Sequence, residues 1–273
     1  MHKLTYMFIG AHPDDADIEF GGTAILLKDL GHEIVFVSAT DGSAGHQAMN
    51  RKELAARRLG ETQKVSQHLG ISYVVMDVLD GELVPDLATR HELIKIIRQC
   101  KPDVIISPRP NDYHPDHRAT GQLVQDCSFL LTVPLVCPDV PRLERNPYIL
   151  YHQDDFTKPT ELNPDVLVDI TPVIDRKMES LALHQSQIFE WLPFIDRYDD
   201  EIPDPAGDYV AWMKRHWGNP GDPIRFKGLL NNPDTEYMEV FECCEYGSNI
   251  TPEIAQEIFP FGFVNFSQKA GRS

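Results

Sequence analysis

The sequence has little positive charge. Its 273 residues include 25 Lys and Arg against 42 Asp and Glu, which gives a formal net charge of −17. Over most of the surface such a charge repels a phosphate backbone, so nucleic acid is not an expected partner. The same charge argues against attachment to anionic lipid through basic residues.

Long apolar runs and paired cysteine motifs are also missing. No stretch reaches the length that crosses a bilayer, so we expect no membrane insertion. The N-terminal residues MHKLTYMFIGAHPDD lack the three parts of a signal peptide, and we predict a cytoplasmic protein. The five cysteines are odd in number and form no CxxC pair, which fits neither a disulfide framework nor a thiolate zinc site.

The first half alternates short β-branched or aromatic runs with longer segments of helical spacing. This pattern predicts an α/β fold, a doubly wound (Rossmann-like) and mostly parallel sheet with helices on both faces. The expected strands are residues 4–9, 34–38, 73–78 and 104–107, and the expected helices are residues 17–30, 51–69 and 87–100. In the usual strand order 3-2-1-4-5, the first and fourth strands are neighbours, and ligands bind in the crevice beyond their carboxyl ends.

The second half is less regular, and we expect it to elaborate a single domain spanning residues 1–273. The predicted elements are a helix at 116–127, strands at 148–152 and 166–170, and a helix at 173–187. A stretch rich in Trp, Pro and Asp at about 190–223 predicts a lid or insertion. A late apolar run at 237–244 predicts an edge strand or a small hairpin.

Two motifs rich in metal-binding residue types follow the first and fourth strands: HPDD at 12–15 and HPDH at 114–117. Both fall at the predicted crevice. Catalytic zinc commonly takes three nitrogen or oxygen ligands and leaves a fourth position for water. Positions three apart share a face at a helix start, which pairs His12 with Asp15 and His114 with His117. Spacing alone leaves open whether Asp14 or Asp15 touches the metal.

The two motifs contain more histidines and aspartates than three metal ligands require. The additional side chains matter because a hydrolytic reaction also needs a base for the attacking water and a donor that stabilises the charge on the substrate oxygen. Asp14 and His114 can fill these roles. The plainer alternative for one motif alone is a helix start, with Pro at the first position and Asp as a cap. Two motifs at one end of neighbouring strands favour a metal site instead, since a buried cluster of carboxylates is costly without a cation.

At these motifs the chain resembles the PIG-L/LmbE-like deacetylase family, whose signatures are AHPDD followed by an acidic residue and Gly-Gly, and a later HPDH. The sequence reads AHPDDADIEFGG at 11–22 and HPDHRATG at 114–121. The segments TDGSAG at 40–45 and RLGETQKVSQHLG at 58–70 extend the resemblance over about the first half of the chain. Asp17 departs from a frequent Glu, and Glu19 stands where small residues are usual.

The resemblance implies a zinc-dependent hydrolase that removes the acetyl group from an N-acetylated sugar of the N-acetylglucosamine type. It implies one Zn²⁺ per chain, held by His12, Asp15 and His117. The same ligands also suit Fe²⁺ or Co²⁺. Relatives often assemble as trimers or hexamers, so a homo-oligomer is expected.

The resemblance also implies the roles of the remaining motif residues. Asp14 would be the general base, His114 would stabilise the oxyanion or protonate the leaving amine, and Asp116 would orient His114. Arg58 lies in the family-like segment at 58–70. Two roles are expected alternatives for its guanidinium: it binds a hydroxyl or phosphate group of the sugar, or it forms an ion pair with Glu61.

Other side chains near the expected crevice have weaker signals. The tryptophans of the 190–223 segment more often anchor such an insertion than stack on a sugar. Single histidines such as His46 and His184 are usually structural. Arg109 and Arg118 flank the second motif and would make the local field less negative.

Three rival interpretations follow from the same residues. A metal-dependent phosphoester hydrolase would use two metals and therefore more than three ligands. A nucleotide-binding module would need a GxGxxG turn, which the sequence does not contain. A non-catalytic sugar-binding relative would be expected to have lost the base, whereas Asp14 is present.

Overall fold

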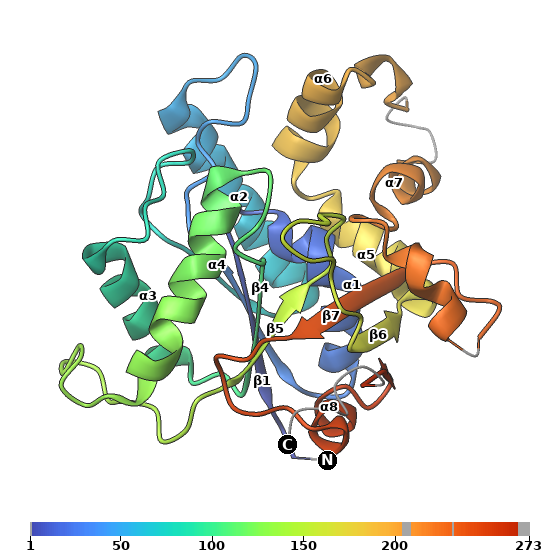
Figure 1. The fold of residues 1–273 in the computed structure, drawn as a ribbon. Helices are drawn as coiled ribbons and strands as arrows, with labels where there is room; N and C mark the ends of the chain where they lie inside the picture. The colour runs from blue at the N-terminus through green and yellow to red at the C-terminus, as the bar shows by residue number, and fades with distance from the viewer. Residues whose placement is uncertain (1, 204–208, 231, 267–273) are drawn as a thin grey trace.

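One eight-stranded sheet runs through residues 2–203, 209–230 and 232–266, which are the residues that the computed structural model describes (Figure 1). Its strand order is β3-β2-β1-β4-β5-β7-β6-β8. The strands are β1 Thr5–Gly10, β2 Glu33–Ser38, β3 Ser72–Val75, β4 Val104–Ser107, β5 Tyr148–His152, β6 Val166–Asp169, β7 Met238–Cys243 and β8 Phe263–Val264. The first five pair in parallel, which confirms the doubly wound α/β class and places β1 beside β4.

The helices begin and end close to the expected positions in the first half of the chain. They are α1 Asp15–Asp29, α2 Arg51–Leu69, α3 Leu87–Cys100, α4 Pro115–Ser128, α5 Ile174–Leu181, α6 Leu192–Asp196, α7 Tyr209–Trp217 and α8 Pro252–Ile258. Local residues mark both ends of α2. The Asn50 side chain caps its start by accepting from the Glu53 N–H, and Gly70, in the left-handed conformation with φ 64°, ends it.

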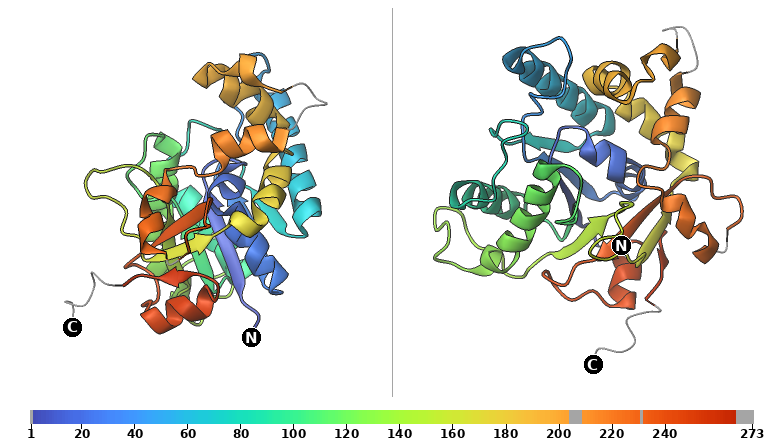
Figure 2. Two further views of the ribbon diagram at one scale, coloured as in Figure 1. Left: turned by 90° about the vertical axis from the view of Figure 1, so that its right-hand side faces the viewer. Right: turned by 45° about the horizontal axis from the view of Figure 1, so that its top comes forward.

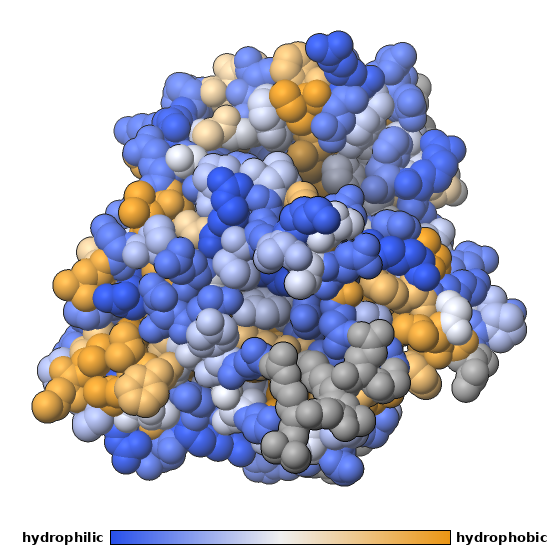
Figure 3. Space-filling model, in the orientation of Figure 1, coloured by the Kyte–Doolittle hydropathy of each residue, from blue (hydrophilic) through white to orange (hydrophobic). Residues whose placement is uncertain are grey.

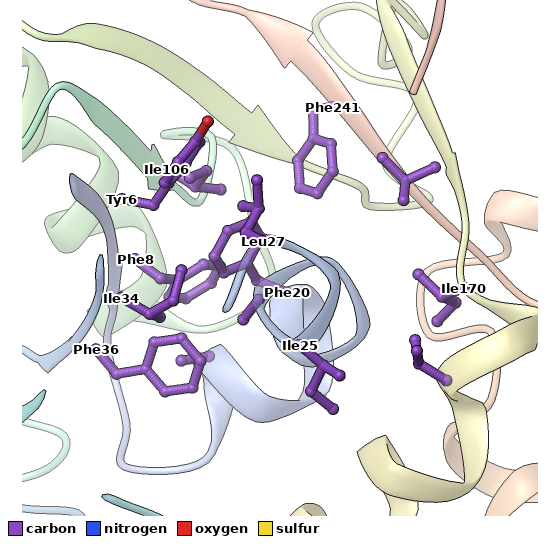
Figure 4. Packing of buried hydrophobic residues seen from close by; sticks show 14 of the residues in the cluster. Tyr6, Phe8, Phe20, Ile25, Leu27, Ile34, Phe36, Ile106, Ile170 and Phe241 are labelled. Atoms are coloured by element: carbon purple, nitrogen blue, oxygen red, sulfur yellow. The ribbon is translucent and has the colours of Figure 1, made fainter. Parts of the chain in front are cut away.

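Alternate residues of the central strands pack against opposite helical layers. Tyr6 and Phe8 of β1 contact the cluster that contains α1 and α5, whereas Met7 and Ile9 contact the cluster that contains α3 and α4. On the first face, Phe8 stacks on Phe20 with ring centroids 5.9 Å apart. Figure 4 shows both rings among the other apolar side chains of this cluster. Both faces of the sheet are thus buried, as parallel sheets require.

The second half differs from expectation at two places. The strand predicted at an edge is β7, which lies inside the sheet and pairs antiparallel with both β5 and β6. The helix predicted over 173–187 ends at Leu181 as α5, because the following turn brings His184 inward to bond Asp17. Four 3-10 segments at Phe129–Thr132, Thr171–Val173, Asp199–Glu201 and Pro223–Leu229 and a π-helical turn at Gln187–Trp191 complete the described elements.

Helices α6 and α7 lie beyond the carboxyl ends of the parallel strands, on the side where both motifs stand (Figures 1 and 2). They belong to the segment predicted as a lid or insertion, whose residues 204–208 fall outside the described part of the chain. Among the described residues, no helix is both long and apolar enough to span a membrane.

A buried ion pair connects α1 to the second half of the sheet. Lys177 of α5 and Glu239 of β7 are both fully buried, with Nζ and Oε1 2.9 Å apart. Lys177 also donates to the Ile18 carbonyl, and the Glu239 carboxylate accepts from the backbone N–H groups of Gly22 and Thr23. Gly22 is also needed for the packing of α1 on Ile170, because a Cβ there would lie 2.7 Å from the Ile170 side chain.

Breaking this pair should be far more costly than breaking its exposed neighbour. Lys177→Met leaves the Glu239 charge buried without a cation to balance it, so we expect the free energy of unfolding to fall by about 3–5 kcal/mol. Arg176→Met removes the exposed pair with Asp29, two side chains each 49% exposed, and should cost at most about 1 kcal/mol. Urea unfolding of both variants is the measurement, and equal shifts would contradict the assigned role of Lys177.

Candidate metal and catalytic site

The HPDD motif forms the tight turn between β1 and α1. The Asp15 carboxylate turns back over this loop, and its Oδ2 accepts from the N–H of Ala11 at 2.7 Å and of His12 at 3.0 Å. Gly10 leaves room for it, since a Cβ there would lie 2.7 Å from the Asp15 Cβ. Asp14 occupies the cap position of α1 without a side-chain cap bond, so a simple helix-cap role does not explain it.

The parallel pairing of β1 with β4 brings the HPDH motif to the same place. His12 Nδ1 lies 3.2 Å from His117 Nε2. Asp15 Oδ1 lies 3.7 Å from His12 Nδ1, and Asp15 Oδ2 lies 3.5 Å from His117 Nε2. A tetrahedral ion with ligands at about 2.0–2.2 Å holds its ligand atoms about 3.3–3.6 Å apart. The three groups thus have the composition and spacing of a three-ligand metal site.

The remaining ring nitrogens of these two histidines face carboxylates. His12 Nε2 lies 3.3 Å from Asp80 Oδ1 and 3.7 Å from Asp116, and His117 Nδ1 lies 3.1 Å from Asp112 Oδ1. Metal-ligating histidines usually donate their second N–H in this way, which fixes the tautomer and ring orientation. Asp80 and Asp112 were not identified from the sequence.

The crowding of imidazoles and carboxylates shifts their pKa values in opposite directions. Burial alone would lower the pKa of His12, but hydrogen bonds to Asp116, Asp15 and Asp80 raise it well above its usual value. Burial is likewise outweighed at Asp15, where His117 and His12 hold the carboxyl pKa below its ordinary range. The site therefore keeps Asp15 ionised, the form in which a carboxylate binds a metal.

Two other groups of possible ligands share His12. His114 joins His12 and His117 with ring nitrogens within 4.8 Å of one another, and Asp80 and Asp116 form a group with His12 Nε2. The latter carboxylates already accept backbone hydrogen bonds, Asp80 from Ala44 and Asp116 from Gly81. Both carboxylates face His12 Nε2, the position from which a carboxylate supports a metal-ligating histidine.

Asp14 and Arg58 form an ion pair beside the three-ligand group. Arg58 Nη2 donates to Asp14 Oδ1 at 2.6 Å, and Arg58 Nη1 donates to the Gly42 carbonyl. Both side chains are almost fully buried yet border the cleft. Glu61 bonds instead to Ser186 and Arg57, so the alternative sequence interpretation, an ion pair of Arg58 with Glu61, is wrong.

His114 is held by its own helix start. Its Nδ1 accepts from the Asp116 backbone N–H at 3.2 Å, which leaves the proton on Nε2. The Asp116 carboxylate points elsewhere, to His12 and to the N–H groups of Gly81 and Leu83. Asp116 therefore contacts His114 through its backbone N–H and not through its carboxylate. The carboxylate faces His12 instead.

These groups lie at the bottom of a cleft of about 720 Å³. Its far wall comes from the 190–223 segment, including Trp191, Trp217 and Asp196, whereas Trp212 is buried against Phe189. Glu19, one helical turn after Asp15, also lines it, and its carboxylate accepts from Gln153 Nε2 at 2.8 Å.

Glu19 shows the effect of burial on a carboxyl group in this cleft. Burial raises the pKa of its carboxyl to about 8, and the carboxylates of Asp15 and Glu239 add to the shift against the opposing charge of Lys177.

The other histidines and arginines considered from the sequence have protein partners. His46 bonds Glu190 at 2.9 Å, and His184 bonds Asp17 at 3.0 Å. Arg109 forms a two-pronged ion pair with Asp154, and Arg118 donates to the carbonyls of residues 112 and 113.

Comparison with known proteins agrees with this geometry. The family profile described as PIG-L, GlcNAc-PI de-N-acetylase, matches residues 7–128. The chain is 30% identical over 203 residues to diacetylchitobiose deacetylase of Thermococcus kodakarensis, covering 68% of this chain and 73% of the relative. It is 30% identical over 190 residues to a probable N-acetyl-alpha-D-glucosaminyl L-malate deacetylase 2 of Bacillus cereus, covering 64% and 80%.

A solved structure supports the same assignment. The N,N'-diacetylchitobiose deacetylase of Pyrococcus horikoshii superposes with a TM-score of 0.66 at 25% identity, covering 88% of this chain and 83% of that one. Fold and comparisons together define the class as the metal-dependent deacetylases, a class of hydrolases. Within it, the chain belongs to the PIG-L family.

Removing a carboxylate behind a metal ligand should weaken metal binding. Asp112→Asn takes the negative partner from His117 Nδ1, so we expect about 10–100-fold weaker zinc affinity. Competition with a chromophoric chelator measures the affinity. Asp126→Asn, on the helix α4 that also carries His117 but paired with Arg90, is the control and should bind zinc normally. Equal affinities for the two variants would show that Asp112 does not support a ligand.

Proposed function

We propose that this chain is a zinc-dependent deacetylase that removes the acetyl group from an N-acetylated sugar. The observation that carries the proposal is the convergence of His12, Asp15 and His117 at 3.2–3.7 Å, with Asp14 beside them at the bottom of one cleft. We propose one Zn²⁺ per chain in this group, where Fe²⁺ or Co²⁺ would also be accepted. When bound, the ion would polarise the acetamide carbonyl and lower the pKa of water from about 15.7 toward about 7.

In this proposal Asp14 takes the proton of the attacking water. Arg58 holds its Oδ1, and among the described residues none donates a hydrogen bond to its other oxygen, Oδ2. The ion pair thus fixes the direction of the carboxylate and leaves one oxygen for proton transfer. On this basis Arg58 is a positioning residue for Asp14, and a direct contact with the sugar is the alternative.

His114 supplies the second group that the reaction needs. Its protonated Nε2 is a hydrogen-bond donor in the neutral ring, and burial beside His12 and His117 lowers the pKa of His114. A neutral donor can still stabilise the oxygen of a tetrahedral intermediate. The proton accepted by Asp14 then passes to the leaving amine, and acetate and the free amino sugar are released.

A sugar substrate is supported by the cleft and by the relatives. Trp191, Trp217 and the exposed Tyr113 border the cleft, and aromatic rings suit the apolar faces of sugars. Both curated relatives carry names that specify N-acetylglucosamine-type compounds. A cytoplasmic location, a trimer or hexamer, and a lid function for 190–223 stay predictions.

Asp14→Asn should separate catalysis from metal binding. We expect acetate release from N-acetylglucosamine oligomers to fall about 100-fold or more, because the amide cannot accept the proton. Zinc content should stay at one per chain in this variant, whereas His12→Ala should lose the metal. Released acetate and metal analysis are the readouts. Undiminished turnover in Asp14→Asn would remove Asp14 from the mechanism.

Arg58→Lys should distinguish the two roles of Arg58. A lysine keeps the charge but cannot reproduce the paired contacts to Asp14 and Gly42, so positioning predicts that kcat falls while KM changes little. Direct sugar binding predicts instead that KM rises and kcat is retained. Steady-state kinetics on one substrate decide between the two.

A further inference from the structure

Many of the polar groups that line the catalytic cleft already have protein partners. Asp14 accepts from Arg58, and both oxygens of Asp154 accept from Arg109. The wall formed by the 190–223 segment is largely apolar, since most of its lining residues are Trp, Leu, Ile or Pro. Apolar side chains also gather over α6 on the face that Figure 3 shows. Hydrogen bonds to a hydroxylated substrate are therefore expected mainly from the base of the cleft.

Glu19 lines this base with one carboxyl oxygen held by the protein and the other open. Gln153 Nε2 donates to Glu19 Oε2 at 2.8 Å, and the Gln153 amide is itself fixed, because its Oε1 accepts from the Val240 N–H at 2.7 Å. Among the described residues, none forms a hydrogen bond with Glu19 Oε1, and this atom is not buried. The contact with Gln153 thus fixes the carboxyl group and leaves Oε1 for a ligand.

His152 presents a second open atom beside Glu19. It is the last residue of β5, only 7% exposed, and its Nδ1 lies 3.6 Å from Glu19 Oε2. Nδ1 donates to the Gln153 carbonyl at 2.8 Å, so in the neutral ring Nε2 is an acceptor. Burial lowers the pKa of His152, which favours this neutral ring. No described residue bonds Nε2, although His152 lines the cleft, and a buried acceptor without a partner points to a ligand.

The two open atoms offer one donor and one acceptor. Burial raises the pKa of Glu19 to about 8, so at neutral pH the carboxyl group carries a proton. Because Oε2 accepts from Gln153, this proton lies on Oε1, which becomes a donor. A hydroxyl group can accept from Glu19 Oε1 and donate to His152 Nε2. An apolar group would leave both atoms unpaired, and an anionic group has no proton to donate to Nε2.

These atoms lie within the span of one sugar ring from the proposed metal ligands. Glu19 follows Asp15 by one helical turn of α1, and the Cβ atoms of side chains spaced in this way are about 5–6 Å apart. This separation is close to the width of a pyranose ring. A sugar whose acetamide carbonyl lies at Asp15 therefore brings a hydroxyl group of the same ring to Glu19.

We propose that Glu19 and His152 form a subsite for a hydroxyl group of the sugar ring that carries the acetamide, with Gln153 as the positioning residue of Glu19. The proposal rests on the proposed function and narrows its substrate class. A sugar in which this hydroxyl is free is accepted, and one in which it is absent or substituted is discriminated against. Small residues are usual at position 19 of the motif, so the discrimination depends on a departure of this sequence from that pattern.

Deoxy analogues test this subsite. The substrates are the methyl glycoside of N-acetylglucosamine and its 3-, 4- and 6-deoxy forms, and acetate release by the zinc-loaded chain gives kcat/KM for each. At one of the three positions, we expect loss of the hydroxyl to lower kcat/KM by about 10-fold or more, because Oε1 and Nε2 are then left unpaired. Glu19→Leu, which keeps much of the bulk, should reduce this penalty by about threefold or more and leave the other two unchanged.

Two further variants separate hydrogen bonding from other effects. Glu19→Gln still offers an N–H donor to the cleft while its carbonyl accepts from Gln153, so it should retain the penalty. Asp29→Asn, an exposed carboxylate at the far end of α1 that pairs with Arg176, should leave all three penalties unchanged. Each penalty is a ratio between two substrates on one variant, so a general loss of stability or of metal cancels.

The outcomes separate this inference from the proposed function. Penalties that Glu19→Leu leaves unchanged at all three positions, or that Glu19→Gln reduces as much as Glu19→Leu does, overturn the subsite alone. Absence of acetate from the methyl glycoside and from N-acetylglucosamine oligomers with the zinc-loaded, unmutated chain overturns the proposed function itself. Isothermal titration of the Asp14→Asn protein, with and without Glu19→Leu, gives the same ratios as Kd values, so the subsite is tested even without turnover.

Discussion

The pairing of β1 with β4 is the constraint on which the site depends. Tyr6 to Phe8 of β1 lie in register with Val104 to Ile106 of β4, so two loops about a hundred residues apart leave the sheet side by side. Because both faces of these strands pack against helical layers, a shift of register would disrupt the close packing on both faces and is disfavoured. The same packing that stabilises the sheet thus sets the 3.2 Å separation of the His12 and His117 nitrogens.

The first half of the chain could be interpreted from its sequence because its signals are local. Asn50 and Gly70 mark the ends of α2, alternating helices and strands fix the parallel order, and the order places the two motifs together. Asp80 could not be found in this way. It lies in an irregular segment between β3 and α3, and its contact with His12 depends on the path of that segment.

Arg58 and β7 show the same limit. Helical spacing paired Arg58 with Glu61, but its guanidinium instead reaches Asp14 across the β1 turn, and Arg57 lies beside Glu61. The run at 237–244 predicts an edge strand or a small hairpin, yet nothing local to it indicates that β7 inserts between β5 and β6. Long-range partners of this kind are chosen by burial and charge complementarity, for which one sequence has no periodic signal.

The elaborated second half stabilises the position of α1, the helix that carries the carboxylate proposed as a metal ligand. Helix α1 begins at Asp15, and three groups of contacts from later elements hold it. They are Ser180 and His184 on Asp17, Gln153 on Glu19, and Lys177 with Glu239 around residues 18–23. Each satisfies a buried polar group that would be costly alone. The reactive groups come from the first half, while the second half fixes their orientation and supplies the outer wall of the cleft. Substrate preference can therefore change through α6 and the loop after β5 without disturbing the metal site.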